Sequence, residues 1–227
     1  MNYERDTKNA YRNEEKATAY LEQYTKGAKW ARFSMWRTRV LIKNFLDHCR
    51  LTAADRLLDI PCGTGYIGQT IQHTPASLIG ADISLEMMDR ARGEYGEDQF
   101  HGFVQADITA TPFLRGSFTC VVVLALMHRL QKGLRQDVLS EVADLSSRFV
   151  IMSYSVDSFP QRMKERVLKI LRPSHIPAPS SMRLRDIRRE VTSHGFKLLR
   201  ISSVASFLSA KVILLMEKDT ERSVENP

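Results

Sequence analysis

The sequence predicts an α/β fold in which a mostly parallel β-sheet carries helices on both faces. Apolar segments of strand length alternate with segments of helical periodicity, the order that strand–helix–strand units produce. Residues 118–124 form an almost continuous apolar run, as expected for a central strand buried on both faces. Within residues 57–68, a short apolar strand ends in Asp59 and continues into a loop that contains three glycines.

The expected elements follow one another in a regular order. Strands are predicted at residues 56–60, 78–82, 103–108, 118–124, 148–156, 197–202 and 210–217, and helices at residues 66–73, 85–92 and 134–145. Ser84 is a suitable N-cap for the second helix, which has Glu86 early and Arg92 late, as the helix dipole prefers. The fifth strand is rich in β-branched and aromatic residues, which favour strands.

Two segments lie outside the central domain, which we place at residues 49–218, and a polar tail follows at 219–227. Residues 1–48 are interpreted as an N-terminal helical cap. Several of its aromatic residues fit either core packing or a substrate wall: Tyr11, Tyr20, Tyr24, Trp30, Phe33 and Trp36. Residues 158–189 are interpreted as a lid insertion, because the proline-rich stretch 172–181 cannot form one helix. Ligands of open α/β sheets bind at the carboxyl ends of the strands, where such a lid would lie.

Length and composition agree with one globular domain. The chain has 227 residues, of which 43% are hydrophobic, enough to bury a sizeable core. The N-terminus lacks the apolar region of a secretory signal, and the longest apolar run, residues 118–127, is about half of a membrane span. Three widely spaced cysteines fit neither a disulfide framework nor a zinc site. We therefore expect a cytoplasmic protein with no metal.

The positive charge is concentrated in one part of the chain. The formal net charge is +7, and residues 161–200 contain eleven Lys and Arg against three acidic residues. Such a field would attract an anionic small molecule, a lipid headgroup at a membrane surface, or RNA. A solvated helix face explains the same pattern equally well. The charge therefore favours an anionic partner without selecting its class.

The glycine loop indicates the kind of cofactor. Gly63, Gly65 and Gly68 have the G-x-G-x-x-G spacing that allows a tight turn and close approach of a ligand. A dinucleotide would place its pyrophosphate over the following helix, but Asp59 just before the loop would repel phosphate. A carboxylate there suits a ligand with an ammonium and a sulfonium. S-adenosylmethionine is such a ligand.

From Asp59 to Gly65 the chain resembles the first motif of the class I S-adenosylmethionine-dependent methyltransferases. The resemblance implies a Rossmann-like sheet of seven strands whose last strand is antiparallel. Asp82, which is 17 residues after Gly65, is positioned to accept hydrogen bonds from the ribose hydroxyls, and the family usually binds the adenine amino group at the position of Asp107. Each of these acids alone could be a helix cap or loop residue, but their joint order and spacing favour a site. The expected cofactor-binding residues are Asp59, Pro61, Cys62, Gly63, Thr64, Gly65, Asp82, Ile83, Met87, Asp107, Ile108 and Leu124.

Residues 20–218 resemble a subgroup of small bacterial methyltransferases more closely. Its features are Arg32-Phe33, the glycine loop, a His-containing loop after the fourth strand, and a fifth strand that ends in Ser153-Tyr154. The subgroup often has a second histidine where this chain has Arg129. Its members are mostly unassigned or act on small molecules and sugar-containing lipids.

Two residues are candidates for catalysis of methyl transfer to a hydroxyl. His128 follows the fourth strand, where the family lines its methyl-transfer site, and imidazole suits proton transfer near neutral pH. A packed, hydrogen-bonded histidine is an equally good interpretation. Tyr154, at the end of the fifth strand, is the second candidate.

The sequence therefore favours an enzyme that methylates a small acceptor, anionic or linked to a sugar or lipid, with O-methylation favoured. RNA ribose or tRNA side-chain methylation is a second hypothesis. Amino methylation of bases is disfavoured, because residues 124–127 lack the expected Asn or Asp with Pro-Pro-Tyr. A non-catalytic S-adenosylmethionine-binding protein is a third hypothesis. A nicotinamide oxidoreductase fits least, because of Asp59.

Overall fold

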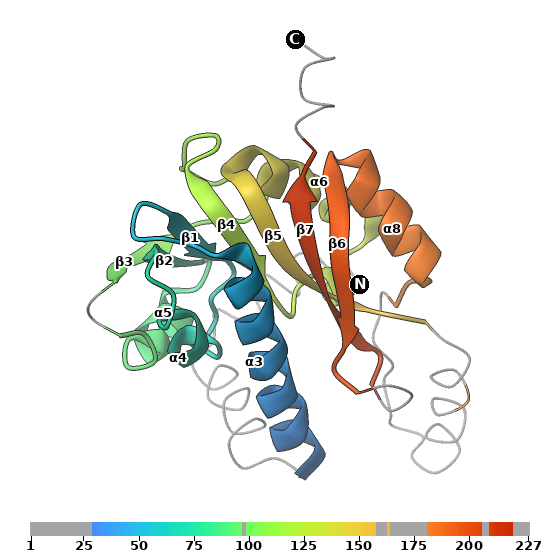
Figure 1. Cartoon of the computed structure of the whole chain (residues 1–227), viewed down its shortest axis with the longest axis horizontal. Helices are drawn as coiled ribbons and strands as arrows, with labels where there is room; N and C mark the ends of the chain where they lie inside the picture. Colours follow the sequence, from blue (N-terminus) through green and yellow to red (C-terminus); the bar gives the residue numbers. More distant parts are fainter. Residues whose placement is uncertain (1–28, 97–98, 158–162, 164–180, 206–208, 220–227) are drawn as a thin grey trace.

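A computed structural model of the chain describes residues 29–96, 99–157, 163, 181–205 and 209–219. Its seven strands form one sheet in the order β3-β2-β1-β4-β5-β7-β6 (Figure 1). The strands are β1 (Arg56–Asp59), β2 (Ser77–Asp82), β3 (Phe100–Gln105), β4 (Phe118–Val123), β5 (Ser146–Ser155), β6 (Phe196–Ser203) and β7 (Lys211–Lys218). β7 runs antiparallel to both of its neighbours, β5 and β6, and the pairings among β1 to β5 are parallel. The predicted fold class is confirmed.

Helices cover both faces of the sheet, and an apolar core lies between the helices and the sheet on each face. The described helices are α3 (Lys29–Cys49), α4 (Gly68–Ile71), α5 (Leu85–Ala91), α6 (Lys132–Leu145) and α8 (Leu184–Ser193), with the short 3-10 helix η1 (Met127–Arg129) after β4. One core joins α3, α4 and α5 to the sheet face at the front of Figure 1. The other core lies between the opposite face and the helices α6 and α8.

Side-chain alternation along the strands decides which residues can meet on each face. In β5, Phe149 and Ile151 belong to the core under α3, whereas Val150, Met152 and Tyr154 belong to the core under α6 and α8. Successive side chains of a strand point to opposite faces. Ser153 and Ser155 therefore share the α3 face of the sheet.

The element ends differ from prediction mainly in two places. The third strand is Phe100–Gln105 rather than 103–108, because the Asp107 carboxylate accepts hydrogen bonds from the N–H and hydroxyl of Thr109 and forms a turn there. Only Gly68–Ile71 of the predicted helix 66–73 is α-helical. Turns occupy the residues before it, and its backbone lies close to that of Glu94.

Helix α3 has two different halves. Its C-terminal half contributes Leu41, Ile42, Phe45 and Leu46 to the core. In its N-terminal half, the side chains of Trp30, Phe33 and Trp36 remain 41%, 41% and 57% exposed and follow one another along the helix. These three aromatic residues are therefore not core, whereas Tyr11, Tyr20 and Tyr24 lie outside the described residues.

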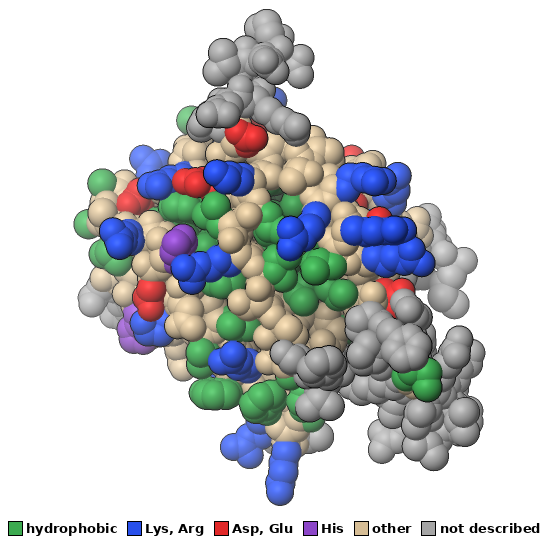
Figure 2. All heavy atoms as spheres, turned by 45° about the vertical axis from the view of Figure 1, so that its right-hand side comes forward, with side chains coloured by type: hydrophobic (Ala, Val, Ile, Leu, Met, Phe, Trp, Pro, Cys, Tyr) green, Lys and Arg blue, Asp and Glu red, His purple; other side chains and the backbone are tan. Residues whose placement is uncertain are grey.

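Most of the predicted lid, residues 158–162 and 164–180, also lies outside the described residues. The chain before and after it is joined by a parallel bridge between Val156 and Met182. The arginines that follow, on and near α8, are solvent-exposed, and Figure 2 shows Lys and Arg side chains gathered on this side of the molecule. None of the described helices is both long and apolar enough to cross a membrane.

Candidate active site

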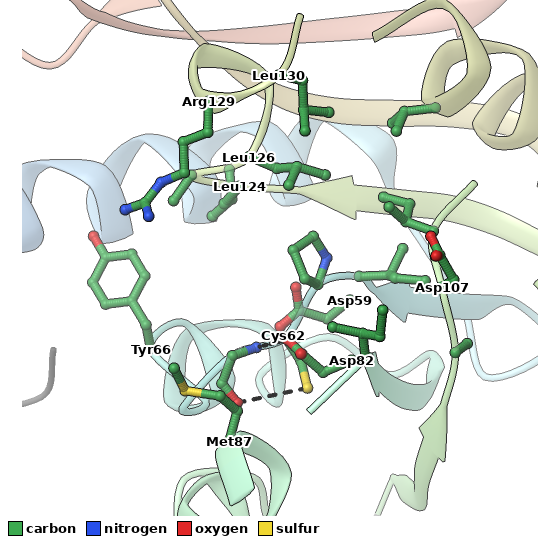
Figure 3. A pocket seen from close by; sticks show the side chains of 18 of the residues that line it. Asp59, Cys62, Tyr66, Asp82, Met87, Asp107, Leu124, Leu126, Arg129 and Leu130 are labelled. Atoms are coloured by element: carbon green, nitrogen blue, oxygen red, sulfur yellow. Dashed lines mark hydrogen bonds between the residues drawn. The ribbon is translucent and has the colours of Figure 1, made fainter. Parts of the chain in front are cut away.

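A pocket opens at the carboxyl ends of β1, β2 and β4, as the parallel part of the sheet predicts. Its volume is about 170 Å³. Figure 3 shows Asp59 and Asp82 close together, with Asp107 on one side and Arg129 and Tyr66 on the other. The lining includes eleven of the twelve expected cofactor-binding residues: Asp59, Pro61, Cys62, Gly63, Thr64, Asp82, Ile83, Met87, Asp107, Ile108 and Leu124.

The glycines of the loop have different structural roles. Gly63 has a φ of +54°, and a Cβ atom added to it would meet nothing within 4 Å. Gly65, which does not line the pocket, has a φ of +75°, and a Cβ there would lie 2.7 Å from the Cβ of Glu94. Gly63 therefore leaves space on the pocket side, whereas Gly65 allows the loop to pack against the turn after α5.

Asp82 connects the second strand to the glycine loop. Its carboxylate accepts hydrogen bonds from the backbone N–H of Gly63 at 2.8 Å and of Ser84 at 3.0 Å. Burial raises the pKa of Asp82, and these two backbone N–H groups oppose the rise. The carboxylate is thus fixed in orientation at the floor of the pocket.

Asp59 is almost completely buried, and among the described residues the hydroxyl of Tyr95 is the only group that hydrogen-bonds to its carboxylate. Tyr95 donates a hydrogen bond to Asp59 over 2.7 Å. Burial raises the pKa of Asp59 to about 7, against this hydrogen bond, which lowers it; the charge of Asp82 adds to the rise. Neither carboxylate has an ion pair within the described part of the chain. The floor of the pocket therefore favours a cationic ligand.

The opposite wall of the pocket is mostly apolar. It comes from the loop after β4 and from α6, and its side chains are Leu124, Leu126, Leu130, Leu134 and Val138. Arg129 also lines the pocket, and Figure 3 shows its side chain extended toward Tyr66. An apolar wall that faces carboxylates suits a ligand with both a cationic and an apolar part.

His128 lies on η1 beside this wall but is not among the lining residues. No hydrogen bond to either ring nitrogen occurs among the described residues. Burial and, after it, the charge of Lys211 lower the pKa of His128 to about 4. Its imidazole is therefore neutral near pH 7, the form that can accept a proton.

Tyr154 does not reach the pocket. Its side chain lies on the α6 and α8 face of the sheet, and its hydroxyl donates to Glu190 at 3.4 Å. Glu190 also forms an ion pair of 3.2 Å with Arg135, whose guanidinium donates to the carbonyl of Leu130. The expectation that Tyr154 shares a cavity with His128 was wrong, because alternation along β5 turns it to the other face.

Three further residues at the site were missed by sequence reasoning. Tyr95 follows α5, and its 36-residue separation from Asp59 gave no local signal. Tyr66, inside the glycine motif, lines the pocket and its hydroxyl donates to the carbonyl of Met35. The ammonium of Lys211, at the start of β7, lies 5.7 Å from the centre of the Tyr66 ring, and its charge lowers the pKa of His128. Strand pairing brings Lys211 to the site, and no motif marks it.

The described residues show neither a cluster of metal-ligating side chains nor a reactive cysteine at the pocket. Within them, no group of three or more His, Cys, Asp or Glu side chains is arranged to hold a metal ion. Cys62 lines the pocket, but burial first, and then the charges of Asp59 and Asp82, raise the pKa of its thiol. Cys62 is therefore a packing group rather than a nucleophile.

Comparison with known proteins finds methyltransferases that are similar to part of this chain. The family described as "Methyltransferase domain" matches residues 57–148. A demethylmenaquinone methyltransferase from Clavibacter sepedonicus is 31% identical over 134 residues, which cover 57% of this chain and 54% of that protein. A malonyl-[acyl-carrier protein] O-methyltransferase from Legionella pneumophila is 31% identical over 78 residues, 34% of this chain and 28% of that one. The chain spans about half the length of the first relative and less of the second.

Solved structures share the fold over more of the chain. Magnesium protoporphyrin IX methyltransferase from Synechocystis, solved with bound S-adenosylhomocysteine, matches 89% of this chain and 99% of its own with a TM-score of 0.69 at 17% identity. Human N-acetylserotonin methyltransferase, solved with S-adenosylmethionine, matches 93% of this chain and 58% of its own with a TM-score of 0.65 at 14% identity. At these low sequence identities the likeness shows the fold alone. This fold agrees with the family match over residues 57–148. A methyltransferase family thus matches residues 57–148 of this chain, and the fold is that of solved methyltransferases with bound S-adenosylmethionine or S-adenosylhomocysteine.

Proposed function

We propose that this protein transfers the methyl group of S-adenosylmethionine to a small acceptor that is anionic or linked to a sugar or lipid, with an oxygen atom as the favoured methyl acceptor. The observation that carries the proposal is the buried pair Asp59 and Asp82, which has no cationic partner in the described part of the chain and lies beside the open space at Gly63. A ligand with ammonium and sulfonium groups would compensate these charges. A pyrophosphate would be repelled.

The roles of the lining residues follow from this placement. Asp82 would bind the ribose hydroxyls, and Asp107 with Ile108 would hold the adenine edge. Met87 and Leu124 are buried apolar side chains that line the pocket and would enclose the adenosine. Asp59 would act through its charge on the cationic end of the cofactor, held in place by Tyr95.

Bound S-adenosylmethionine supplies an already activated methyl group. The chain has to orient the acceptor in line with the bond that breaks and to keep water out. The apolar wall after β4 suits the second task. The buried pair of Arg135 and Glu190 supports that wall, because Arg135 holds the carbonyl of Leu130 at 2.9 Å.

A hydroxyl acceptor also has to lose a proton, and His128 is our candidate for the base. Its ring is neutral near pH 7 for the reasons given above, and it lies on the same short helix as the pocket residue Arg129. Tyr154 is not part of this proposal, because its hydroxyl lies at Glu190 on the other face.

One relative supports oxygen as the atom methylated, and the relatives together do not select the acceptor. The Legionella relative is an O-methyltransferase that acts on malonyl-acyl carrier protein, and the others act on demethylmenaquinone and on magnesium protoporphyrin IX. These acceptors differ widely in size and chemistry, so the acceptor of this chain has to be found by experiment.

Isothermal titration with S-adenosylmethionine, S-adenosylhomocysteine and NAD, in separate runs, tests the proposal. We expect micromolar binding of the first two ligands and none of NAD. Binding of NAD alone would overturn the assignment of Asp59 and the function built on it. With binding established, transfer of a labelled methyl group to a panel of hydroxyl and carboxylate acceptors should depend on His128, so a His128→Gln variant should lose turnover and keep its affinity for S-adenosylhomocysteine. Full turnover of this variant would remove His128 from the mechanism.

A further inference from the structure

Basic side chains from separate segments surround Tyr66 at one side of the pocket. The Nε of Arg39, on α3, donates a 3.1 Å hydrogen bond to the carbonyl of Tyr66, and its guanidinium lies 5.5 Å from the centre of the Tyr66 ring. The ammonium of Lys211, on β7, lies 5.7 Å from the same ring centre. His128 is close enough to Lys211 to respond to its charge. We call Arg39, Lys211 and His128 the basic cluster.

Lys211 has no acidic partner within the described ranges. Its ammonium takes part in no ion pair or hydrogen bond there, and its side chain is partly buried. Strand pairing sets Lys211 opposite Ser155, so it belongs to the α3 face of the sheet at the end where the pocket opens. Burial lowers the pKa of Lys211 to about 8, so the ammonium is still mostly protonated at neutral pH.

Arg39 also has capacity that the fold does not use. Its Nε is occupied by the carbonyl of Tyr66, whereas its two terminal nitrogens make no hydrogen bond or ion pair with the described residues. The buried Arg135, by contrast, is matched by Glu190 and a backbone carbonyl. Removing cations from water without a counter-charge costs free energy, and a ligand that brings negative charge recovers it.

We propose that Lys211 and Arg39 form an oxyanion subsite that binds a carboxylate or phosphate group of the acceptor beside Tyr66. This inference rests on the proposed function, since it names the place where the acceptor is held. Tyr66 lines the cofactor pocket, so an anion bound here leaves the rest of the acceptor next to that pocket and to His128. Arginine suits the role because its planar nitrogens bind both carboxylate and phosphate in pairs.

Calorimetry of the full chain saturated with S-adenosylhomocysteine tests this subsite, with malonate and inorganic phosphate as separate probes. We expect at least one of them to bind at one site per chain. The Lys211→Met variant should lose roughly tenfold in affinity for that probe, the loss of one charge-assisted hydrogen bond, and Lys211→Arg should retain most of it. Lys197→Met is the matched control, because Lys197 is an exposed lysine on the neighbouring strand β6, and it should bind the probe as the unchanged chain does.

Each result decides the proposal. The probe that binds identifies the group as carboxylate or phosphate. Binding of neither probe, or equal binding by the unchanged chain and by Lys211→Met, overturns the subsite. If Lys211→Met does not fold, Arg39→Leu replaces it with the same expected loss. Binding of S-adenosylhomocysteine is measured first in the same cell, so failure of the subsite is distinguished from failure of the cofactor assignment.

Discussion

Two buried polar clusters on opposite faces of the sheet differ in whether their charges are balanced. Under α8, Arg135 and Glu190 form an ion pair in which both side chains are 8% exposed, and Tyr154 adds a hydrogen bond. In the pocket, Asp59 and Asp82 are buried as deeply, but their partners are a tyrosine hydroxyl and backbone N–H groups.

The difference indicates which cluster stabilises the fold and which one binds. A paired cluster loses stability when one member is removed, because the remaining charge is buried alone. An unbalanced cluster costs stability in the free protein and regains it when a ligand of opposite charge binds. Variants of the two clusters should therefore have opposite effects on folding and on cofactor binding.

The largest effect is expected for Glu190→Gln. This change leaves the guanidinium of Arg135 buried without its counter-ion, so the free energy of unfolding should fall by about 3–5 kcal/mol. Urea denaturation measures it. The double variant Arg135→Met/Glu190→Leu, which removes both charges, should lose much less. Equal losses in the two proteins would show that packing, rather than the ion pair, is responsible.

The next largest effect is expected for Asp82→Asn. Binding of S-adenosylmethionine should weaken by about 3 kcal/mol, because charge-assisted hydrogen bonds to the ribose are lost, whereas the free energy of unfolding should not fall as it does for Glu190→Gln. Titration calorimetry and urea denaturation test the two parts. Asp89→Asn is the control, since Asp89 is an exposed residue of α5 paired with Arg92. Unchanged affinity in Asp82→Asn would remove Asp82 from the ribose site.

Asp59 should make cofactor binding depend on pH. Its pKa is raised to about 7, so the carboxylate is ionised above this pH and attracts the cationic cofactor. It is protonated below, and affinity should fall as the pH falls through 7, by up to about tenfold per pH unit. In Tyr95→Phe, loss of the hydrogen bond to the carboxylate should shift this transition to higher pH. The titrating groups of the ligand affect the pH dependence of affinity equally in the Asp59→Asn variant. The difference between the profiles of the unchanged chain and of Asp59→Asn therefore isolates the contribution of Asp59, and identical profiles would refute its role.

The smallest effect is expected for Tyr154→Phe. Its hydroxyl makes one long hydrogen bond to Glu190, so the free energy of unfolding should change by no more than about 1 kcal/mol. Affinity for S-adenosylhomocysteine should stay the same, because Tyr154 does not reach the pocket. A large loss of affinity would mean that the α8 cluster and the pocket are coupled through Leu130.

Local patterns predicted the sheet well, because each strand is marked by its own apolar run and each parallel strand ends at the same edge. The positions of Asp59, Asp82 and Asp107 in one pocket follow from that rule alone. Contacts between distant segments could not be predicted in this way. Tyr95 reaches Asp59 through the packing of a turn, and Lys211 reaches the pocket through strand pairing. The face of Tyr154 depended on a register that the motif Ser153-Tyr154 does not fix.

The bridge between Val156 and Met182 has a consequence for how this protein can evolve. The N–H of Asp157 donates to the carbonyl of Met182, and the N–H of Met182 donates to the carbonyl of Ser155. The chain thus leaves the sheet and rejoins it at one place, held by backbone groups that any sequence supplies. Since the entropy of closing a chain segment grows only slowly with its length, we expect a change in the number of residues between these anchors to alter the stability of the sheet little.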